Sequence, residues 1–282
     1  MVRILCDSTC DLSAELTERY GIVILPLHVS LGDKEYLDGV DIFPEDLYRW
    51  SDENKSTPKT SAVSMEDVAA VFGPILESGD EIVCFSISDS MSSTGSCMRM
   101  AAQDMDAEDK VTVIDSANLS TGIGLLLIEA AIMARQGRSR EEIREWVEKL
   151  KPSVRASFVV DTLTYLYRGG RCTGVSALAG GMLRIHPKIL VEQGAMTVGK
   201  KYRGKLNKVI MSYVKDMEED LKKARKERVF ITHSGVNDEI VEEVKDYLTK
   251  LNVFDEILVT RAGSVVSSHC GPGTLGVLFI AD

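Results

Sequence analysis

The densest group of side chains that could do chemistry in this sequence is a run of hydroxyls from Ser86 to Ser96, in which seven of eleven residues are serine or threonine. The run follows an apolar segment typical of a buried strand, Glu81 to Phe85, and precedes a helix-prone segment, Cys97 to Gln103. Hydroxyls and the N–H groups at a helix start can converge on an anion. Because the run has no lysine or arginine, it suits a small carboxylate or one phosphate oxygen better than a polyphosphate. Helix capping and a turn would explain only two or three of these hydroxyls.

Histidine is the other residue type that could take part in binding or catalysis. The chain has four: His28, His186, His233 and His269. His269 stands out because Gly-Pro-Gly follows it two residues later, which indicates a tight turn able to bring backbone close to a ligand. His28 and His186 adjoin apolar runs, and we expect structural roles for them. In a strand, His269 and Cys270 would point to opposite faces, which disfavours a Cys–His nucleophile pair. No Gly-x-Ser-x-Gly nucleophile elbow occurs.

Two glycine patterns resemble nucleotide-binding motifs. Gly199 to Leu206 has the phosphate-loop spacing of two glycines and a lysine, but Leu206 stands where a Ser or Thr must hold magnesium. Gly122-Ile123-Gly124 lacks the third glycine of the dinucleotide fingerprint and lies in a helical pattern, so we expect close helix packing there.

Composition narrows the class of protein. The chain has 282 residues, 44% of them hydrophobic, and a net charge of −10, which argues against nucleic acid and anionic lipid surfaces as partners. No apolar run approaches the length of a membrane span, so we expect a soluble, cytoplasmic protein without stable membrane insertion. The six cysteines form no Cys-x-x-Cys pair or zinc spacing, so no metal is expected.

The first half of the chain alternates predicted strands with predicted helices, which favours an α/β domain with a parallel sheet covered on both faces. The strands are expected at Val2 to Leu5, Ile22 to Val29, Glu81 to Phe85 and Lys110 to Ile114. The helices are expected at Ser13 to Tyr20, Pro44 to Trp50, Met65 to Leu76, Cys97 to Gln103, Leu119 to Gln136 and Ser139 to Leu150. Ligands of such sheets bind at the carboxyl ends of strands. The loops Asp7 to Thr9, Ser86 to Ser96 and Asp115 to Ser120 should therefore share one edge.

Lys151-Pro152 breaks this alternation and predicts a boundary between an N-terminal domain, 1–151, and a C-terminal domain, 152–282. The second half mixes a hairpin around Gln193-Gly194 with single strands and helices, which indicates a second α/β domain with a mixed sheet. Its strands are expected at Val154 to Val160, Ile189 to Glu192, Ala195 to Val198, Val229 to Thr232, Glu256 to Thr260 and Leu275 to Ala281, and its helices at Thr162 to Tyr167, Leu206 to Arg225 and Asp238 to Leu251.

Five motifs in order resemble the DegV family of bacterial fatty-acid-binding proteins over the whole chain. They are Asp7-Ser8-Thr9 with Asp11-Leu12, Pro58-Lys59-Thr60-Ser61, the serine run, Tyr165-Leu166-x-x-Gly169-Gly170-Arg171, and Ser268-His269-x-Gly271-Pro272-Gly273. The resemblance implies two α/β domains that hold a long-chain fatty acid between them. It also implies a separate ATP-dependent kinase that makes an acyl phosphate on the carboxylate. The chain departs from the family pattern at Ala62-Val63, where Gln-Pro is usual, and at Ser93, where glycine is usual.

On this resemblance the protein is expected to bind lipid rather than to be an enzyme itself, with a fatty acid as ligand and no cofactor. Thr60 and Ser92 are the first candidates to contact the carboxylate. Ser61, Ser93 and His269 follow, and Arg171 is a candidate loop or partner contact. Small and apolar residues from Ala177 to Leu183, with Met182, could line the acyl tunnel, although core packing explains them equally well.

Two alternatives remain open from the residues. One is a stand-alone hydrolase or phosphoryl transferase that acts on a carboxylate, which predicts turnover without a partner. The other is a binder of a different small amphiphilic acid, which the identity of the extracted ligand would distinguish.

Overall fold

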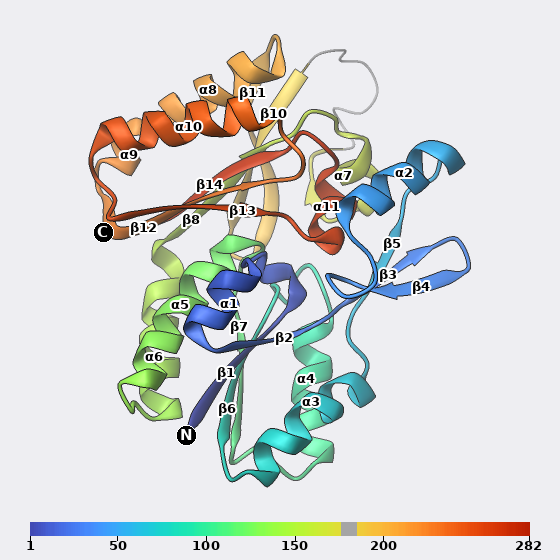
Figure 1. Ribbon diagram of the computed structural model, residues 1–282, viewed down its shortest axis with the longest axis vertical. Coiled ribbons are helices and arrows are strands. Elements are labelled where there is room, and N and C mark those ends of the chain that lie inside the picture. The colour runs from blue at the N-terminus through green and yellow to red at the C-terminus, as the bar shows by residue number, and fades with distance from the viewer. Residues whose placement is uncertain (176–184) are drawn as a thin grey trace.

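A computed structural model of the chain describes residues 1–175 and 185–282. It is an α/β structure with a parallel sheet in the first half and a mixed sheet in the second (Figure 1). This agrees with the fold class predicted from the sequence. Ala177 to Leu183, including Met182, lie outside the described residues.

The first sheet is parallel and has the strand order β2-β1-β6-β7. Its strands are β1 (Val2–Asp7), β2 (Ile22–Leu25), β6 (Glu81–Ser86) and β7 (Val111–Asp115). Consecutive residues point to opposite faces and both faces are buried, as with Ile4 and Leu5 of β1. The chain leaves β1, β6 and β7 at the same edge, where Asp7 Oδ2 accepts a hydrogen bond from Ile87 N at 2.7 Å and Ser88 N donates to Asn118 O at 3.0 Å. The predicted shared edge of the three loops is confirmed.

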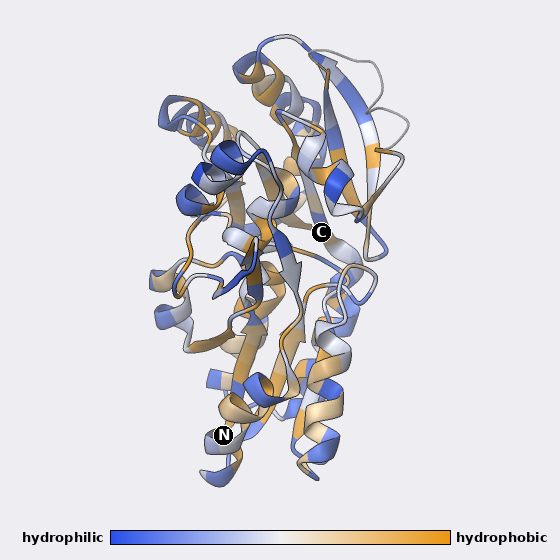
Figure 2. Ribbon diagram, turned by 90° about the vertical axis from the view of Figure 1, so that its right-hand side faces the viewer, coloured by the Kyte–Doolittle hydropathy of each residue, from blue (hydrophilic) through white to orange (hydrophobic). Residues whose placement is uncertain are grey.

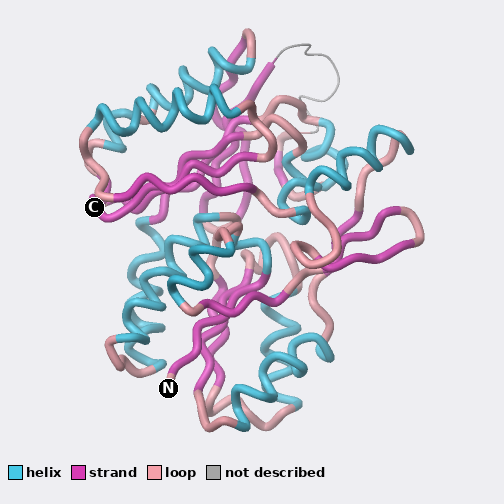
Figure 3. Tube along the Cα trace, in the orientation of Figure 1, coloured by secondary structure: helices cyan, strands magenta, loops and turns pink. Residues whose placement is uncertain are grey.

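Helices cover both faces of this sheet, with α1, α5 and α6 on one side and α3 and α4 on the other (Figure 3). The helices of this half are η1 (Ser8–Cys10), α1 (Ala14–Tyr20), α2 (Pro44–Asn54), α3 (Met65–Glu77), α4 (Thr94–Asp104), α5 (Thr121–Arg135) and α6 (Arg140–Leu150). Serines cap three of these helices: Ser13, Ser64 and Ser139 each accept a backbone N–H at a helix N-terminus.

The predicted single strand from Ile22 to Val29 is wrong. It is divided into β2 and β3 (His28–Leu31), which belong to different sheets, with Pro26 between them. Proline has no N–H to donate, so it ends the pairing of β2 with β1. β3 instead forms a small antiparallel sheet with β4 (Lys34–Leu37) and β5 (Lys59–Ser61).

The second sheet is mixed and has the strand order β13-β12-β14-β8-β10-β11-β9. Its strands are β8 (Val154–Val159), β9 (Cys172–Thr173), β10 (Ile185–Glu192), β11 (Ala195–Arg203), β12 (Ala224–His233), β13 (Glu256–Arg261) and β14 (Leu275–Ala281). The helices of this half are η2 (Lys151–Ser153), α7 (Thr164–Gly169), α8 (Leu206–Asp216), α9 (Glu218–Leu221), α10 (Asp238–Leu251) and α11 (Ser264–Cys270). The predicted hairpin around Gln193-Gly194 is confirmed.

The predicted helix from Leu206 to Arg225 is divided into α8 and α9, and the prediction is wrong at its C-terminal end. The helix is interrupted at Met217, and the chain enters β12 at Ala224. Strand β12 pairs with β14 and β13, with Ala224 opposite Ala281 of β14 and Arg228 opposite Glu256 of β13. Pairing with distant strands therefore outweighs local helix propensity here.

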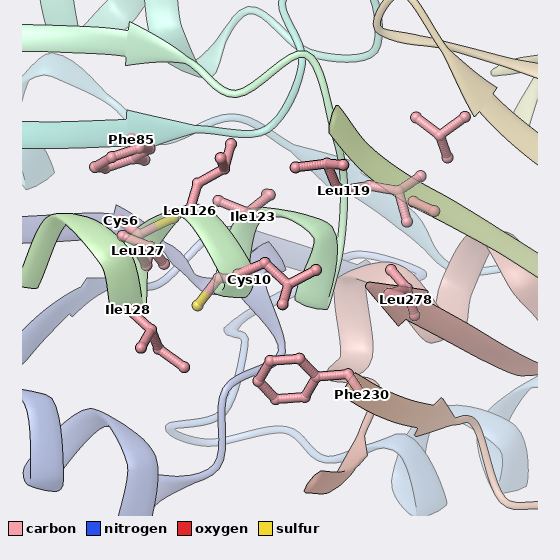
Figure 4. Close-up of a cluster of buried hydrophobic side chains, with 14 of the residues drawn as sticks. Cys6, Cys10, Phe85, Leu119, Ile123, Leu126, Leu127, Ile128, Phe230 and Leu278 are labelled. Atoms are coloured by element: carbon pink, nitrogen blue, oxygen red, sulfur yellow. The ribbon is translucent and has the colours of Figure 1, made fainter. Parts of the chain in front are cut away.

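One hydrophobic cluster joins the two halves. Figure 4 shows Leu119, just before α5, and Ile123 in its first turn together with Phe230 of β12 and Leu278 of β14. Figure 2 likewise shows hydrophobic residues, coloured orange, concentrated on the strands of the sheets. Gly122 and Gly124 of α5 allow close packing: a Cβ at Gly124 would lie 2.8 Å from the Leu12 side chain. This confirms the packing role predicted for the Gly-Ile-Gly pattern. In the described part of the chain, no helix combines the length and apolar character of a membrane span.

Candidate functional site

A cavity of about 290 Å³ lies among β5, the serine run, α7 and α11. Every residue proposed from the sequence as a carboxylate or loop contact lines it: Thr60, Ser61, Ser92, Ser93, Arg171 and His269. The fold thus gathers candidates from four separate motifs around one space.

The contact that links the two most distant motifs is between Thr60 and His269. Thr60 Oγ1 lies 2.9 Å from His269 Nε2. Thr60 is held in β5 by pairing with Val29 of β3, and His269 lies in the last turn of α11. A hydroxyl and an imidazole are both able to donate a hydrogen bond to a carboxylate while remaining uncharged.

His269 is neutral at pH 7. Burial, with a smaller contribution from the positive charge of Arg171, lowers the pKa of His269 to about 4. Within the described residues, its buried Nδ1 atom has no hydrogen-bond partner. His269 therefore offers the cavity a neutral imidazole, and Arg171 supplies a positive charge in the same lining.

The strand geometry considered for His269 and Cys270 does not apply, because both belong to α11 and both line the cavity. Sequence reasoning missed this helix since no side chain of its own caps its N-terminus. Cys270 Sγ donates to Val266 O at 3.0 Å, and burial raises the pKa of the Cys270 thiol well above its usual range. The thiol stays protonated, so the arrangement does not form a Cys–His nucleophile pair.

Gly169, the last residue of α7, makes room for the His269 ring. A Cβ at Gly169 would overlap Nδ1 of the imidazole. Gly271, directly after α11, packs against the Tyr165 ring in the same way. These close approaches explain two glycines of the motifs that the sequence singled out, and Gly169 lets α7 pack directly against the imidazole.

Ser92 and Ser93 are the hydroxyls of the serine run that reach the cavity. Ser92 Oγ accepts from Thr94 N at 3.2 Å and lies 2.9 Å from Thr94 Oγ1, at the start of α4. Ser93 is exposed and makes no capping bond to that helix. The Ser93 hydroxyl is therefore available to a ligand, whereas Ser92 is already oriented by the helix start.

Other hydroxyls of the run have a structural role that the sequence did not reveal. Ser88 Oγ and Ser90 Oγ both donate to the carbonyl oxygen of Gly194, in the turn between β10 and β11. Gly194 has φ of +81°, and a Cβ there would lie 2.6 Å from Ser88 Oγ. The run is thereby attached to the mixed sheet, which places Met196 of β11 on the cavity wall.

The rest of the cavity is mostly apolar. Sequence reasoning did not identify these residues, because apolar side chains at loop ends look like ordinary core: Leu27, Ile87, Met91, Leu119, Leu166, Met196, Val265 and Val266. A few polar groups at one side of an apolar cavity are typical of a site for an amphiphilic ligand.

A second, basic pocket of about 560 Å³ adjoins the first and shares Thr60, Arg171 and His269 with it. Its wall adds Lys55, Lys59 and Arg168 and contains no acidic residue. None of its four cationic side chains belongs to an ion pair among the described residues. In a chain with a net charge of −10, this is a local concentration of positive charge.

Three aspartates are buried beside the site: Asp7, Asp11 and Asp38. Burial raises the pKa of Asp7 to about 6 and that of Asp11 to about 8, against the opposing effect of their hydrogen bonds. Burial also raises the pKa of Asp38. Among the described residues, no group of His, Cys, Asp or Glu is arranged to hold a metal ion.

The remaining sequence candidates lie away from the cavity lining. His28 Nε2 lies 2.9 Å from Asp67 Oδ2, and His186 is buried between the carbonyls of Val160 and Gly204. The Gly199 to Leu206 pattern runs along β11 into α8 rather than from a parallel strand into a helix. It is not built as a phosphate loop.

Comparison with known proteins gives a match over the full chain. The family model described as "Uncharacterised protein, DegV family" matches residues 1–282. A DegV domain-containing protein of Caldanaerobacter subterraneus is 33% identical over 280 residues, covering 99% of this chain and 98% of the relative. A DegV domain-containing protein of Deinococcus radiodurans is 32% identical over 276 residues, covering 98% of this chain and 97% of the relative.

Solved structures show the same likeness. A DegV family protein from Thermus thermophilus, described for its fatty acid binding, superposes with a TM-score of 0.89 at 30% identity, covering 100% of this chain and 99% of that one. A stearic acid-binding protein from Eubacterium ventriosum gives a TM-score of 0.86 at 31% identity, covering 100% of this chain and 98% of that one.

Proposed function

This chain belongs to the DegV family, and we propose that it binds a long-chain fatty acid, with the carboxylate at Thr60 and His269 and the acyl chain along the apolar wall. The observation that carries this proposal is a cavity whose lining combines neutral donors such as Thr60 and His269 with mostly apolar side chains, and in which Arg171 is the only cation among the described residues. The fatty acid binding described for the related Thermus and Eubacterium proteins supports the same ligand class.

The carboxylate would be bound by hydrogen bonds rather than by an ion pair. Thr60 and Ser92 are the first proposed contacts, and Ser61, Ser93 and His269 surround them. These neutral groups would donate to the carboxylate and leave it accessible to a second reactant, and Arg171, the cation that lines the cavity, is exposed.

The acyl chain supplies most of the affinity in this proposal. Burial of a methylene group contributes about 0.8 kcal/mol, so a dozen methylenes contribute about 10 kcal/mol before the costs of ordering the ligand. The apolar residues that line the cavity, among them Leu27, Met196 and Val266, support this arrangement.

We further propose that the protein presents the carboxylate to a separate ATP-dependent kinase, which forms an acyl phosphate, and that this takes place in the cytoplasm. The basic pocket around Lys59, Arg168 and Arg171 supports this step, since it opens beside the head-group position and would attract phosphate groups or an acidic partner surface. We infer that 1–151 and 152–282 act as the two domains that enclose the ligand.

The ligand proposal is tested by extracting the purified protein with organic solvent and identifying the lipid by mass spectrometry. We expect a stoichiometric C14 to C18 fatty acid, or uptake of one added to the delipidated protein. Recovery of a different amphiphilic acid would change the ligand class. No fatty acid in either arm would refute the proposal, and turnover of ATP or acyl esters without a partner would point to an enzyme.

The kinase step is tested with Arg168→Glu and Lys59→Glu in an assay with a bacterial fatty acid kinase subunit, ATP and fatty acid. We expect both variants to bind fatty acid like the wild type but to support much less acyl phosphate formation. Lys149→Glu, on the exposed side of α6, is the matched control and should not change either measurement. Equal acyl phosphate formation by all four proteins would argue against a role for the basic pocket.

A further inference from the structure

Helix α11 receives its N-terminal caps from elsewhere in the chain. Asp38 Oδ1 accepts from Ser264 N at 2.7 Å, and Asp11 Oδ1 accepts from Gly263 N at 2.8 Å. The first N–H groups of a helix have no partner within the helix, and carboxyl oxygens of other residues can accept from them. Because α11 has no side-chain cap of its own, these two carboxyl groups define where it begins.

Both carboxyl groups are fixed on their other side by the first half of the chain. Asp11 Oδ2 accepts from Ser120 Oγ at 2.5 Å, and Asp38 Oδ2 accepts from Ser8 Oγ at 2.8 Å. Ser8 Oγ in turn accepts from Leu27 N at 3.1 Å. The carboxyl groups therefore bridge α11, which lies between β13 and β14, to the loops at the edge of the parallel sheet.

Helix α11 is short, and its far end carries the proposed head-group site. Val265 and Val266 in its first turn and His269 in its last turn line the cavity. The helix has no room to move near the first turn, where a Cβ on Gly263 would lie 3.2 Å from both oxygens of Asp38. A displacement of the first turn of α11 would therefore move the side of the cavity that α11 forms, including the His269 imidazole that contacts Thr60.

We propose that Asp11 and Asp38 are positioning residues for the head-group site: by capping α11 they hold His269 against Thr60. This inference rests on the proposed function in so far as it concerns fatty acid affinity. It does not require either aspartate to touch the ligand, and neither lines the cavity.

The charge state of Asp11 decides which replacement is conservative. The groups that act on it are Asp7 and Asp38, whose charges raise its pKa, and the hydroxyl of Ser120 with the N–H of Gly263, which lower it. The Cys270 thiol is the other titratable group coupled to it. Since burial dominates and the pKa of Asp11 rises to about 8, the carboxyl is neutral at pH 7, and asparagine is its closest substitute.

The test uses Asp11→Ala, Asp38→Ala and Asp11→Asn in the full chain, with two measurements: the dissociation constant for a C16 fatty acid, and the pKa of His269 followed by NMR in the ligand-free protein. For the two alanine variants we expect the His269 pKa to rise from about 4 toward 6.5 and fatty acid binding to weaken by about tenfold. Asp11→Asn should stay within about twofold of the wild type.

Glu142→Ala is the matched control, because Glu142 also accepts a backbone N–H at a helix N-terminus but caps α6. It should lower the melting temperature without changing the His269 pKa or fatty acid affinity. Folded alanine variants with an unchanged His269 pKa and unchanged affinity would overturn the proposal.

Gly263→Ala keeps both carboxyl groups and crowds them, so it provides the test if the alanine variants do not fold. It should raise the His269 pKa by a smaller amount, and an unchanged value would overturn the proposal. If the wild type binds no fatty acid, the proposed function fails, while the His269 pKa in the ligand-free variants still decides the positioning role.

Discussion

His269 Nε2 lies 2.9 Å from Thr60 Oγ1, although 209 positions separate the two residues in the sequence. Thr60 is placed by a three-residue edge strand and His269 by a short helix of the other half of the chain. The contact joins the two halves of the chain at the proposed head-group position and places two neutral donors side by side.

Replacement of Thr60 by valine should weaken fatty acid binding by about tenfold. Valine has nearly the same shape but lacks the hydroxyl, so one hydrogen bond to the carboxylate is lost and His269 loses its partner. The measurement is the dissociation constant of a C16 fatty acid. Thr249→Val, which removes an exposed hydroxyl on α10, is the control and should bind like the wild type. Equal affinity of Thr60→Val and the wild type would place the carboxylate elsewhere.

Ser93→Gly tests the hydroxyl that distinguishes this chain from the pattern it resembles. The Ser93 side chain lines the cavity and does not cap α4, so its hydroxyl can contribute to the carboxylate network. We expect affinity to fall by about threefold to tenfold, measured by titration with fatty acid. Ser96→Gly, in the first turn of the same helix, controls for the added backbone freedom. Unchanged or tighter binding by Ser93→Gly would mean that Ser92 and Thr60 suffice.

Gly169→Ala should displace the imidazole without removing any polar group. The added Cβ would overlap His269 Nδ1, so either the ring or α7 must shift. We expect weaker fatty acid binding and a higher pKa of His269, because a displaced ring is more exposed to water. Gly73→Ala, in α3 where a Cβ meets no atom within 4 Å, is the control. If Gly169→Ala has the affinity and His269 pKa of the wild type, the close packing is not needed for the site.

The low pKa of His269 predicts a pH dependence of stability. In the folded protein the imidazole titrates at about 4, whereas in an unfolded chain it titrates near 6.5. As the pH falls, the unfolded state takes up the proton first, so the stability that the neutral imidazole provides is present above about pH 6.5 and is lost progressively toward pH 4. The shift of about 2.5 pKa units corresponds to a loss of about 3 kcal/mol.

The measurement is the difference in free energy of unfolding between the wild type and His269→Gln from pH 7 to pH 4. Asp7 and Asp11, whose pKa values are raised, contribute in the opposite direction, but they do so in both proteins and are removed by the comparison. A difference that stays constant over this range would show that His269 titrates normally in the folded protein.

Much of the architecture could be predicted from the sequence because it is encoded locally. The serines at 13, 64 and 139 mark helix starts by their own capping bonds, and alternating strand and helix patterns specify a parallel sheet with ligand-binding loops at one edge. The hydroxyl run predicted a small-anion site by residue type, and the family resemblance added Thr60 as a proposed carboxylate contact. Each of these features depends on residues within a few positions of one another.

Only the tertiary structure decided the features that depend on distant partners. Helix α11 has no local cap, since Asp11 and Asp38 supply its acceptors, so its sequence did not reveal it. Ser88 and Ser90 bind Gly194 of a hairpin that follows more than a hundred residues later, so their hydroxyls looked like ligand contacts. Hydrogen bonds and packing between remote segments leave no period or spacing in the sequence, and they determine which of the many hydroxyls face the cavity.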